Sequence, residues 1–192
     1  MIAADLTREL ESRGAILRGH FRLSSGRHSA QFIQKFRILE DPVLVSAVAE
    51  RIVAGLRERG IASPAIVVSA AVGGIVLGYE VARQLGVHAI FVEKEDGRAT
   101  LRRGFALKPG EAALVVEDVV TTGLSVREVI DVVRAQGAEV VGVAVIVVRE
   151  AVDFGVTTVA LLELPIVSYD PAECPLCRAA EPLTEPGSRF LR

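Results

Sequence analysis

The sequence predicts a single α/β domain built on an open parallel sheet with helices packed against it. Short β-branched runs alternate with helical stretches of about 10–12 residues, which is typical of right-handed βαβ units. The chain has 192 residues, enough for one domain with a substantial core. No internal repeat, low-complexity tract or linker divides it, so we expect one domain over residues 1–192.

The N-terminal part is expected to hold a helix, a pair of extended segments and a second, longer helix. Apolar positions at helical spacing in residues 4–18 predict a first helix that ends near Gly19. Residues 21–36 alternate irregularly around a Ser-Ser-Gly turn, which indicates a short hairpin or paired extended segments. The Asp-Pro pair at 41–42 begins a long helix to about residue 60, because aspartate caps a helix and proline suits its first turn.

The remainder alternates regularly between strands and helices. Strands are expected at 65–69, 88–92, 112–116, 140–148 and 158–162, and helices at 74–85 and 125–136. Gly86 and Gly137 follow the two helices, where glycine commonly ends a helix. Ligands of such sheets bind beyond the carboxyl ends of the strands. We therefore expect the site in the loops after residues 69, 92, 116 and 148.

Composition excludes several classes of function. The net charge is only −2, which gives no support to a nucleic-acid partner. The longest apolar stretch, 140–148, is far shorter than the ~18 residues that a membrane span needs. The N-terminus shows no secretion signal and two cysteines make no disulfide framework, so a cytoplasmic location is expected.

The loop after residue 116 has the composition of a ribose-phosphate site. Glu117 and Asp118 stand at a strand end, where carboxylates suit hydrogen bonding to vicinal hydroxyls. The Thr-Thr-Gly-Leu-Ser turn that follows offers N–H groups, hydroxyls and a positive helix end to a phosphate. Gly123 lets the backbone approach that phosphate. An ordinary capped junction would explain Thr122 or Ser125, but not two acids directly after a buried strand.

Four stretches resemble known sequences. VVEDVVTTGLS, at 115–125, closely resembles the phosphoribosyl-pyrophosphate (PRPP) motif of the type I phosphoribosyltransferases. FRLSSGRHS, at 21–29, resembles the N-terminal segment of orotate phosphoribosyltransferases, usually F-x-L-x-S-G-x-x-S. Residues 69–75 occupy the place of that family's pyrophosphate loop, and 92–95 resemble the start of its mobile catalytic loop. VVRE, at 147–150, resembles the strand end whose arginine holds orotate.

The resemblance implies a fold and a reaction. The fold is a five-stranded parallel sheet with helices on both sides, a small N-terminal hood at about 19–40, and a C-terminal tail from about 165. The reaction joins orotate to the phosphoribosyl group of PRPP, with Mg²⁺, and gives orotidine 5′-monophosphate and pyrophosphate in pyrimidine biosynthesis. A homodimer is implied as well. The alternatives are a purine or other base phosphoribosyltransferase, and a PRPP-sensing regulator without turnover.

Roles for particular residues follow from the same resemblance. Lys94, Arg98 and Asp118 are the expected catalytic residues, and Thr121, Arg149 and Phe32 are expected at orotate. Magnesium is expected to be held mainly by PRPP, with no certain protein ligand. The expected PRPP-binding residues are Glu117, Asp118, Val119, Val120, Thr121, Thr122, Gly123, Leu124, Ser125, Val72, Gly73 and Lys94.

The sequence departs from the family at the pyrophosphate end. Ser24 stands where many members have a lysine, Val72-Gly73 replaces a Tyr-Lys pair, and the loop at 93–98 lacks the family's further lysine and histidine. Backbone N–H groups of residues 71–74 and the side chains of Arg98, Arg102 and Arg103 are candidates to compensate. The alternative is that the arginines belong to a solvated charged hairpin.

Cys174 and Cys177 have the spacing of half a zinc site, C-x₂-C. No third or fourth ligand is near them in the sequence, and His20, His28 and His88 show no metal-ligand spacing. We therefore expect a tight turn with two free or paired thiols. Two chains sharing a Cys₄ site is the less favoured alternative.

Overall fold

The computed structural model describes residues 3–23, 25–61 and 63–186, so Ser24 and the last residues of the predicted tail lie outside it. The chain forms two compact units. The smaller unit joins residues 1–40 to residues 165–192, and the larger one holds residues 41–164. The predicted single domain over 1–192 stays a prediction.

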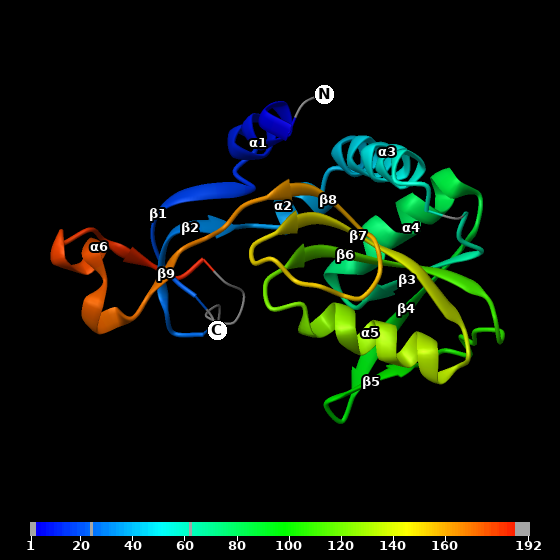
Figure 1. Ribbon diagram of the computed structural model, residues 1–192. Coiled ribbons are helices and arrows are strands. Elements are labelled where there is room, and N and C mark those ends of the chain that lie inside the picture. Colours follow the sequence, from blue (N-terminus) through cyan, green and yellow to red (C-terminus); the bar gives the residue numbers. More distant parts are fainter. Residues whose placement is uncertain (1–2, 24, 62, 187–192) are drawn as a thin grey trace. The chain divides into compact units, whose positions relative to one another are not determined.

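The larger unit contains a sheet with the strand order β5-β4-β3-β6-β7-β8 (Figure 1). Five of the strands are parallel, and β5 pairs antiparallel with β4 at the edge. The predicted open parallel sheet is therefore confirmed, with one antiparallel strand added. The strands are β3 (Ile66–Ala70), β4 (His88–Glu95), β5 (Arg98–Leu101), β6 (Ala112–Val120), β7 (Glu139–Val148) and β8 (Thr158–Glu163).

Three helices pack against these strands. α3 (Pro42–Glu58) begins as predicted, since the Asp41 carboxylate accepts hydrogen bonds from the backbone N–H groups of Val43 and Leu44. α4 (Gly73–Leu85) ends at Gly86, which has a left-handed conformation with φ of 72°. α5 (Leu124–Ala135) follows the predicted PRPP motif.

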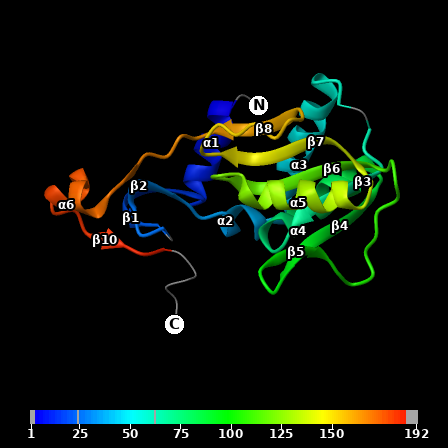
Figure 2. The ribbon, with the colours of Figure 1, turned by 60° about the horizontal axis from the view of Figure 1, so that its bottom comes forward.

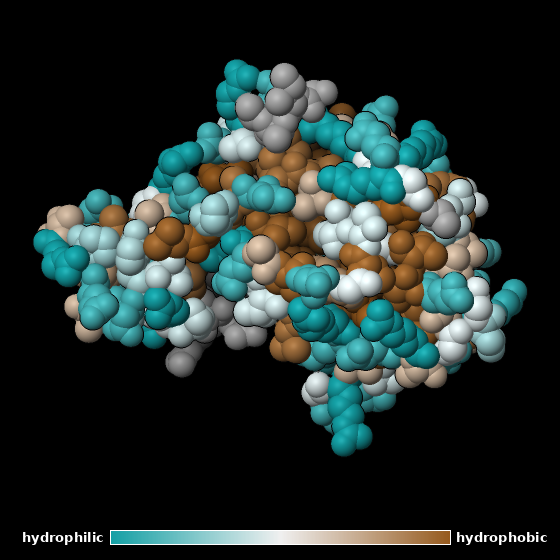
Figure 3. Space-filling model, viewed as in Figure 1, coloured by the Kyte–Doolittle hydropathy of each residue, from teal (hydrophilic) through white to brown (hydrophobic). Residues whose placement is uncertain are grey.

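The helices cover both faces of the sheet (Figures 1 and 2). Alternation along β3 shows why: Val68 belongs to the buried cluster that includes Val126 and Val129 of α5, whereas Val67 and Ser69 lie against Gly78 of α4. α3 packs on α4 and on β8. In Figure 3, hydrophobic residues show between α3 and α5, and hydrophilic ones cover the outer sides of these helices. None of the helices in the described part is long and apolar enough to cross a bilayer.

The smaller unit has a four-stranded sheet of order β10-β1-β2-β9. Its strands are β1 (Ile16–Arg22), β2 (His28–Ile33), β9 (Ser168–Tyr169) and β10 (Leu183–Thr184), and its helices are α1 (Ala3–Ser12), α2 (Phe36–Leu39) and α6 (Pro175–Arg178), with a 3₁₀ turn at Pro171–Glu173. The β1–β2 pair confirms the predicted paired segments, although β1 begins earlier than expected.

The first predicted helix is wrong beyond Ser12. Gly14 takes a left-handed conformation with φ of 69°, which ends α1 and turns the chain into β1. Ile16 then pairs with Ile33 of β2 and is buried there. Ile16 happens to follow Leu6 and Leu10 at a spacing that a helix would also give. The apolar pattern alone therefore extended the predicted helix too far.

Candidate active site

The carboxyl ends of four parallel strands meet at one edge of the larger unit's sheet. Backbone pairing aligns Ala70 of β3 with Val92 of β4, and Val120 of β6 with Val148 of β7. Ser69 is aligned in turn with Val116. The four loops that the sequence singled out therefore leave the same edge, where ligands bind in sheets of this kind.

Glu117 and Asp118 are buried inside β6, with exposed fractions of 6% and 1%. Each carboxylate accepts a hydrogen bond from the next backbone N–H: Glu117 Oε1 from Asp118 at 3.0 Å, and Asp118 Oδ1 from Val119 at 2.6 Å. These bonds orient both carboxylates. Two oriented carboxylates near a strand end are suited to holding two neighbouring hydroxyl groups.

The strand itself extends further than predicted. We expected β6 to end at residue 116, but it continues to Val120 because β7 runs beside it and pairs with Val119 and Val120. The two acids therefore lie within the strand and not in the loop. Their backbone is fixed by the sheet, which makes them rigid ligand groups.

Gly123 is the N-cap residue of α5, and no side chain caps the first turn of that helix. Its φ is 77°, and a Cβ atom there would lie 2.8 Å from Val152 Cγ1 and 2.9 Å from Phe154 Cε1. Only glycine fits, because the loop after β7 packs directly against the turn. The uncapped N–H groups and the helix dipole leave a positive, anion-binding end.

The loop between β3 and α4 approaches the acids. A Cβ atom on Gly74 would lie 3.2 Å from Glu117 Oε1 and 3.1 Å from the Val116 carbonyl oxygen, so this glycine lets the start of α4 reach β6. Val72 is the N-cap of α4 without a side-chain cap, and its own side chain is 72% exposed. Unlike Val72, Gly73 is buried. This loop therefore offers backbone groups next to the carboxylate pair.

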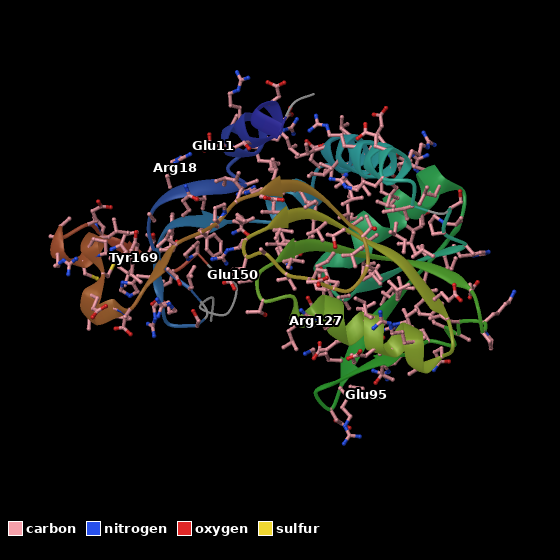
Figure 4. All side chains as sticks on the ribbon, viewed as in Figure 1. Glu11, Arg18, Glu95, Arg127, Glu150 and Tyr169 are labelled. Carbon is pink, nitrogen blue, oxygen red and sulfur yellow. The ribbon has the colours of Figure 1, made fainter. Side chains whose placement is uncertain are left out.

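The predicted catalytic loop is a short hairpin. β4 and β5 pair Lys94 with Ala99 and turn at Asp96 and Gly97, both with positive φ. Figure 4 shows Glu95 at the far end of this hairpin. Lys94 Nζ lies 2.9 Å from Glu128 Oε1 on α5, and the lysine side chain remains 58% exposed. Lys94 is thus held toward α5 by one weak surface ion pair.

The neighbouring arginines differ from one another. Arg103 donates two hydrogen bonds to Glu93, at 2.9 and 2.8 Å, and lowers the pKa of that carboxyl; Arg102 pairs with Glu95 at 3.3 Å. Both therefore belong to the charged hairpin in this conformation. Arg98 forms no ion pair with any residue in the described part of the chain, so its charge is available.

Arg149 directly follows β7, and its backbone N–H donates to the Val120 carbonyl at 2.8 Å. Its side chain is half-buried, and the buried Nε has no hydrogen-bond partner among the described residues. Burial lowers the pKa of the guanidinium, and Glu150, labelled in Figure 4, partly opposes that shift. A desolvated guanidinium with an unsatisfied donor is suited to a planar anion.

Phe32 lies in the smaller unit, where its ring packs against Phe21 with centroids 5.9 Å apart. Its predicted contact with orotate stays a prediction. Sequence reasoning named Gly74 only for its backbone, among residues 71–74, and missed Glu128 of the larger unit. No sequence signal pairs Glu128 with a lysine 34 residues away.

The interpretation of the cysteines was wrong in one respect. His20 and His28, which showed no metal-ligand spacing, lie beside Cys174 and Cys177, with all four ligand atoms within 4.8 Å of one another. The histidines come from β1 and β2, more than 140 residues earlier in the chain. Spacing rules that consider neighbouring residues only cannot find such a cluster.

The parallel sheet, the buried carboxylate pair and the uncapped start of α5 define the type I phosphoribosyltransferase class, and the comparisons agree. A family model described as the phosphoribosyl transferase domain matches residues 38–153. The orotate phosphoribosyltransferase of Heliobacterium modesticaldum is 50% identical over 177 residues, 91% of this chain and 92% of that protein. That of Thermotoga petrophila is 47% identical over 95% of this chain and 97% of its own length. The chain belongs to the phosphoribosyltransferase family, among the orotate phosphoribosyltransferases.

A solved structure extends the likeness to three dimensions. The crystal structure of the orotate phosphoribosyltransferase from Aeropyrum pernix superposes with a TM-score of 0.72 at 30% identity. The match covers 83% of this chain and 93% of that one. The fold class predicted from the sequence is thereby confirmed.

Proposed function

We propose that this protein transfers the phosphoribosyl group of PRPP to orotate, giving orotidine 5′-monophosphate and pyrophosphate. The observation that carries the proposal is the pair of buried carboxylates, Glu117 and Asp118, followed by the uncapped start of α5 at Gly123. The names of the relatives, at about half identity over nearly the whole chain, supply orotate as the base.

The chemistry explains these residue types. Breaking the bond at ribose C1 places positive charge on the sugar and negative charge on the leaving pyrophosphate. The carboxylates of Glu117 and Asp118 bind the ribose hydroxyls and place anionic charge beside the sugar as that charge develops. The turn at residues 121–125 holds the 5-phosphate through backbone N–H groups and hydroxyls. With both ends fixed, C1 is presented to the base.

Magnesium fits the donor set at this edge of the sheet. Glu117 and Asp118 offer only carboxylate oxygens, the ligand type that Mg²⁺ prefers. PRPP itself would hold most of the ion's coordination, with these two residues as the protein's anionic groups nearby. When bound, the ion supplies charge neutralisation for the pyrophosphate.

Arg149 is the proposed orotate-binding residue, together with Thr121. The guanidinium has an unsatisfied buried Nε, and its backbone is anchored to the end of the PRPP-binding strand. A carboxylate can accept two parallel hydrogen bonds from a guanidinium. These bonds replace the water that the buried guanidinium has lost, and they fix the orientation of the orotate ring. Purine bases carry no such carboxylate, so this residue favours orotate.

Lys94 and Arg98 are proposed to reach the pyrophosphate from the hairpin of a second copy of the chain. In the described conformation Lys94 is turned to Glu128 and Arg98 has no ion-pair partner in the described part of the chain. An exposed pair of this kind is worth only about 0.2–1 kcal/mol, so a diphosphate can displace Glu128. The N–H groups at residues 72 and 73 are the proposed contribution of the α4 loop.

An orotate absorbance assay with PRPP and Mg²⁺ tests the proposal. We expect orotate to disappear only when both PRPP and the metal are present, and adenine, hypoxanthine and uracil to be left unconsumed. Consumption of another base with no loss of orotate would show a different transferase. PRPP binding by calorimetry without turnover of any base would show a regulator.

Two variants of Arg149 refine the base assignment. Arg149→Ala is expected to raise the KM for orotate by about 10- to 100-fold, since a charge-assisted pair contributes about 1.5–3 kcal/mol. Arg149→Lys keeps the charge but not the two-pronged geometry, so it should recover only part of the loss. The KM for PRPP should change by less than about threefold in both variants. If the KM values for orotate and for PRPP rose equally, Arg149 would be maintaining the structure of the whole site and not contacting orotate specifically.

A further inference from the structure

A second cluster of reactive side chains lies in the smaller unit, apart from the transferase residues in sequence. It joins His20 of β1 and His28 of β2 to Cys174, the residue before α6, and Cys177 within α6. β1 and β2 pair antiparallel, with an irregularity between Arg18 and Phe21, and the rings of His20 and His28 lie with their centroids 4.9 Å apart. The C-terminal segment then brings both cysteines to these rings.

The nitrogen–sulfur distances in the cluster are close to those of a tetrahedral zinc site, and the two ring nitrogens lie somewhat closer together than in such a site. His20 Nε2 lies 3.6 Å from Cys174 Sγ and 3.7 Å from Cys177 Sγ, and His28 Nδ1 lies 3.3 Å from Cys177 Sγ. The two ring nitrogens are 2.9 Å apart. Tetrahedral zinc with its usual bond lengths separates nitrogen from sulfur by about 3.6 Å and two nitrogens by about 3.3 Å.

The orientation of His20 is fixed by a bond on the far side of its ring. Nδ1 lies 2.9 Å from the carbonyl oxygen of Glu181, to which it can only donate. In the neutral imidazole Nε2 then carries no proton, and this atom faces the other three ligand atoms. A hydrogen bond from the second ring nitrogen to a carbonyl is the usual support of a metal-binding histidine.

Burial separates this cluster from a chance meeting of polar groups. His20 is 3% exposed, His28 6% and Cys174 1%, while Cys177 closes the cluster from the outside. Three of the four side chains are in the interior, where polar groups lose hydration, and ligation of one ion would use all four donor atoms at once. A disulfide between the cysteines would use the two sulfur atoms and leave the imidazoles facing each other.

We propose that His20, His28, Cys174 and Cys177 bind one Zn²⁺ as a closed structural site. Two imidazoles and two thiolates suit zinc and do not suit magnesium. Four protein ligands leave no open position for substrate or water, so the ion does not take part in catalysis. Its effect is to fasten α6 and the segment after it to the β1–β2 pair. The ion would add to the pairing of β10 with β1 and of β9 with β2, which already joins these two sequence-distant segments.

Metal analysis of the full-length protein tests the site. Protein purified without chelator from cells grown in zinc-supplemented medium should contain about one zinc ion per chain, as measured by inductively coupled plasma mass spectrometry. Cys177→Ser and His28→Asn should each lower that content several-fold. His88→Asn is the matched control, because His88 is exposed at the start of β4 and stands outside the cluster. Zinc loss in the control as well would contradict the assignment.

Cobalt substitution of the wild-type protein gives a test that does not depend on how the variants fold. Chelator-treated protein reloaded with Co²⁺ should show intense visible bands of a tetrahedral ion together with a thiolate-to-cobalt charge-transfer band. A six-coordinate spectrum, no binding of zinc in a chelator competition, or an intact mass two hydrogens low from a Cys174–Cys177 disulfide would each overturn the proposal. None of these readouts requires turnover, so they are independent of the orotate assay.

Discussion

Single residues at the sheet edge carry conformational demands that other residues cannot meet. Gly123 combines a positive φ with side chains from the loop after β7 within 3 Å of the position that a Cβ would take. The backbone conformation and the close contact are separate penalties, and the chain offers a way to measure them apart. Gly110 has nearly the same φ, 74°, with nothing within 4 Å of the position that its Cβ would take.

Gly123→Ala is expected to destabilise the protein by about 2–4 kcal/mol, the sum of a left-handed alanine and an overpacked contact. Gly110→Ala should cost only the conformational part, about 1 kcal/mol. Urea unfolding measures both. The KM for PRPP should rise at least about tenfold in the first variant alone, because the turn that holds the 5-phosphate must shift. Equal destabilisation by the two substitutions would show that Val152 and Phe154 move aside freely.

Pairs of elements are tied by polar networks that apolar patterns do not reveal. Between α3 and α4, Glu80 accepts hydrogen bonds from Arg83, Gln84 and Ser46. The bond from Arg83 is the largest cause that lowers the pKa of Glu80 from 4.5 to about 2. Because the folded pKa is depressed, ionised Glu80 stabilises the fold above about pH 4.5, and this contribution is lost as pH falls toward 2.

Glu80→Gln should therefore lower the free energy of unfolding by about 1–2 kcal/mol at pH 7, a value reduced from the full shift because Arg83 is 59% exposed. The difference from wild type should shrink as the pH is lowered from about 5 to about 3. Urea titrations at several pH values measure it, with Glu58→Gln at the exposed end of α3 as control. A wild-type minus variant difference that stays constant over this range would exclude the ionisation of Glu80 as its source.

Element by element, the sequence was most informative where periodicity and capping agreed. The α3 start at Asp41, the α4 end at Gly86 and the parallel strands followed from patterns that depend on neighbouring residues. The boundary errors arose where tertiary pairing decides. β6 runs on to Val120 because β7 lies beside it, and Ile16 is in a strand because Ile33 pairs with it.

At the scale of the whole molecule, the two sites differ in whether neighbouring residues or distant parts of the chain form them. The PRPP motif is contiguous, so its residues and their order can be read from the sequence alone. The cluster of His20, His28, Cys174 and Cys177 is assembled from opposite ends of the chain and needs the smaller unit's sheet to exist. Arg149 stands between these cases, since its position after β7 was predicted but its buried, unsatisfied Nε was not.

Assembly of two chains is the remaining prediction at this scale, because Lys94 is proposed to act in the active site of a partner copy. Lys94→Ala should lose most of the PRPP-dependent activity because the leaving pyrophosphate loses a cation, and Asp118→Asn should lose activity through the ribose site. When the two inactive variants are mixed and allowed to exchange subunits, half of the dimers become mixed. One site in each mixed dimer then has a normal Lys94 and a normal Asp118.

The mixture should therefore recover about a quarter of wild-type activity, with sedimentation showing a dimer throughout. If Lys94 instead serves its own chain, every site in the mixture carries one of the two changes and no activity returns. Glu128→Gln adds a directional check, because it releases Lys94 from its surface ion pair. That variant should raise kcat/KM for PRPP by up to about fivefold, the equivalent of an exposed pair of roughly 1 kcal/mol. A loss of activity in Glu128→Gln would mean that the pair positions Lys94 and does not compete for it.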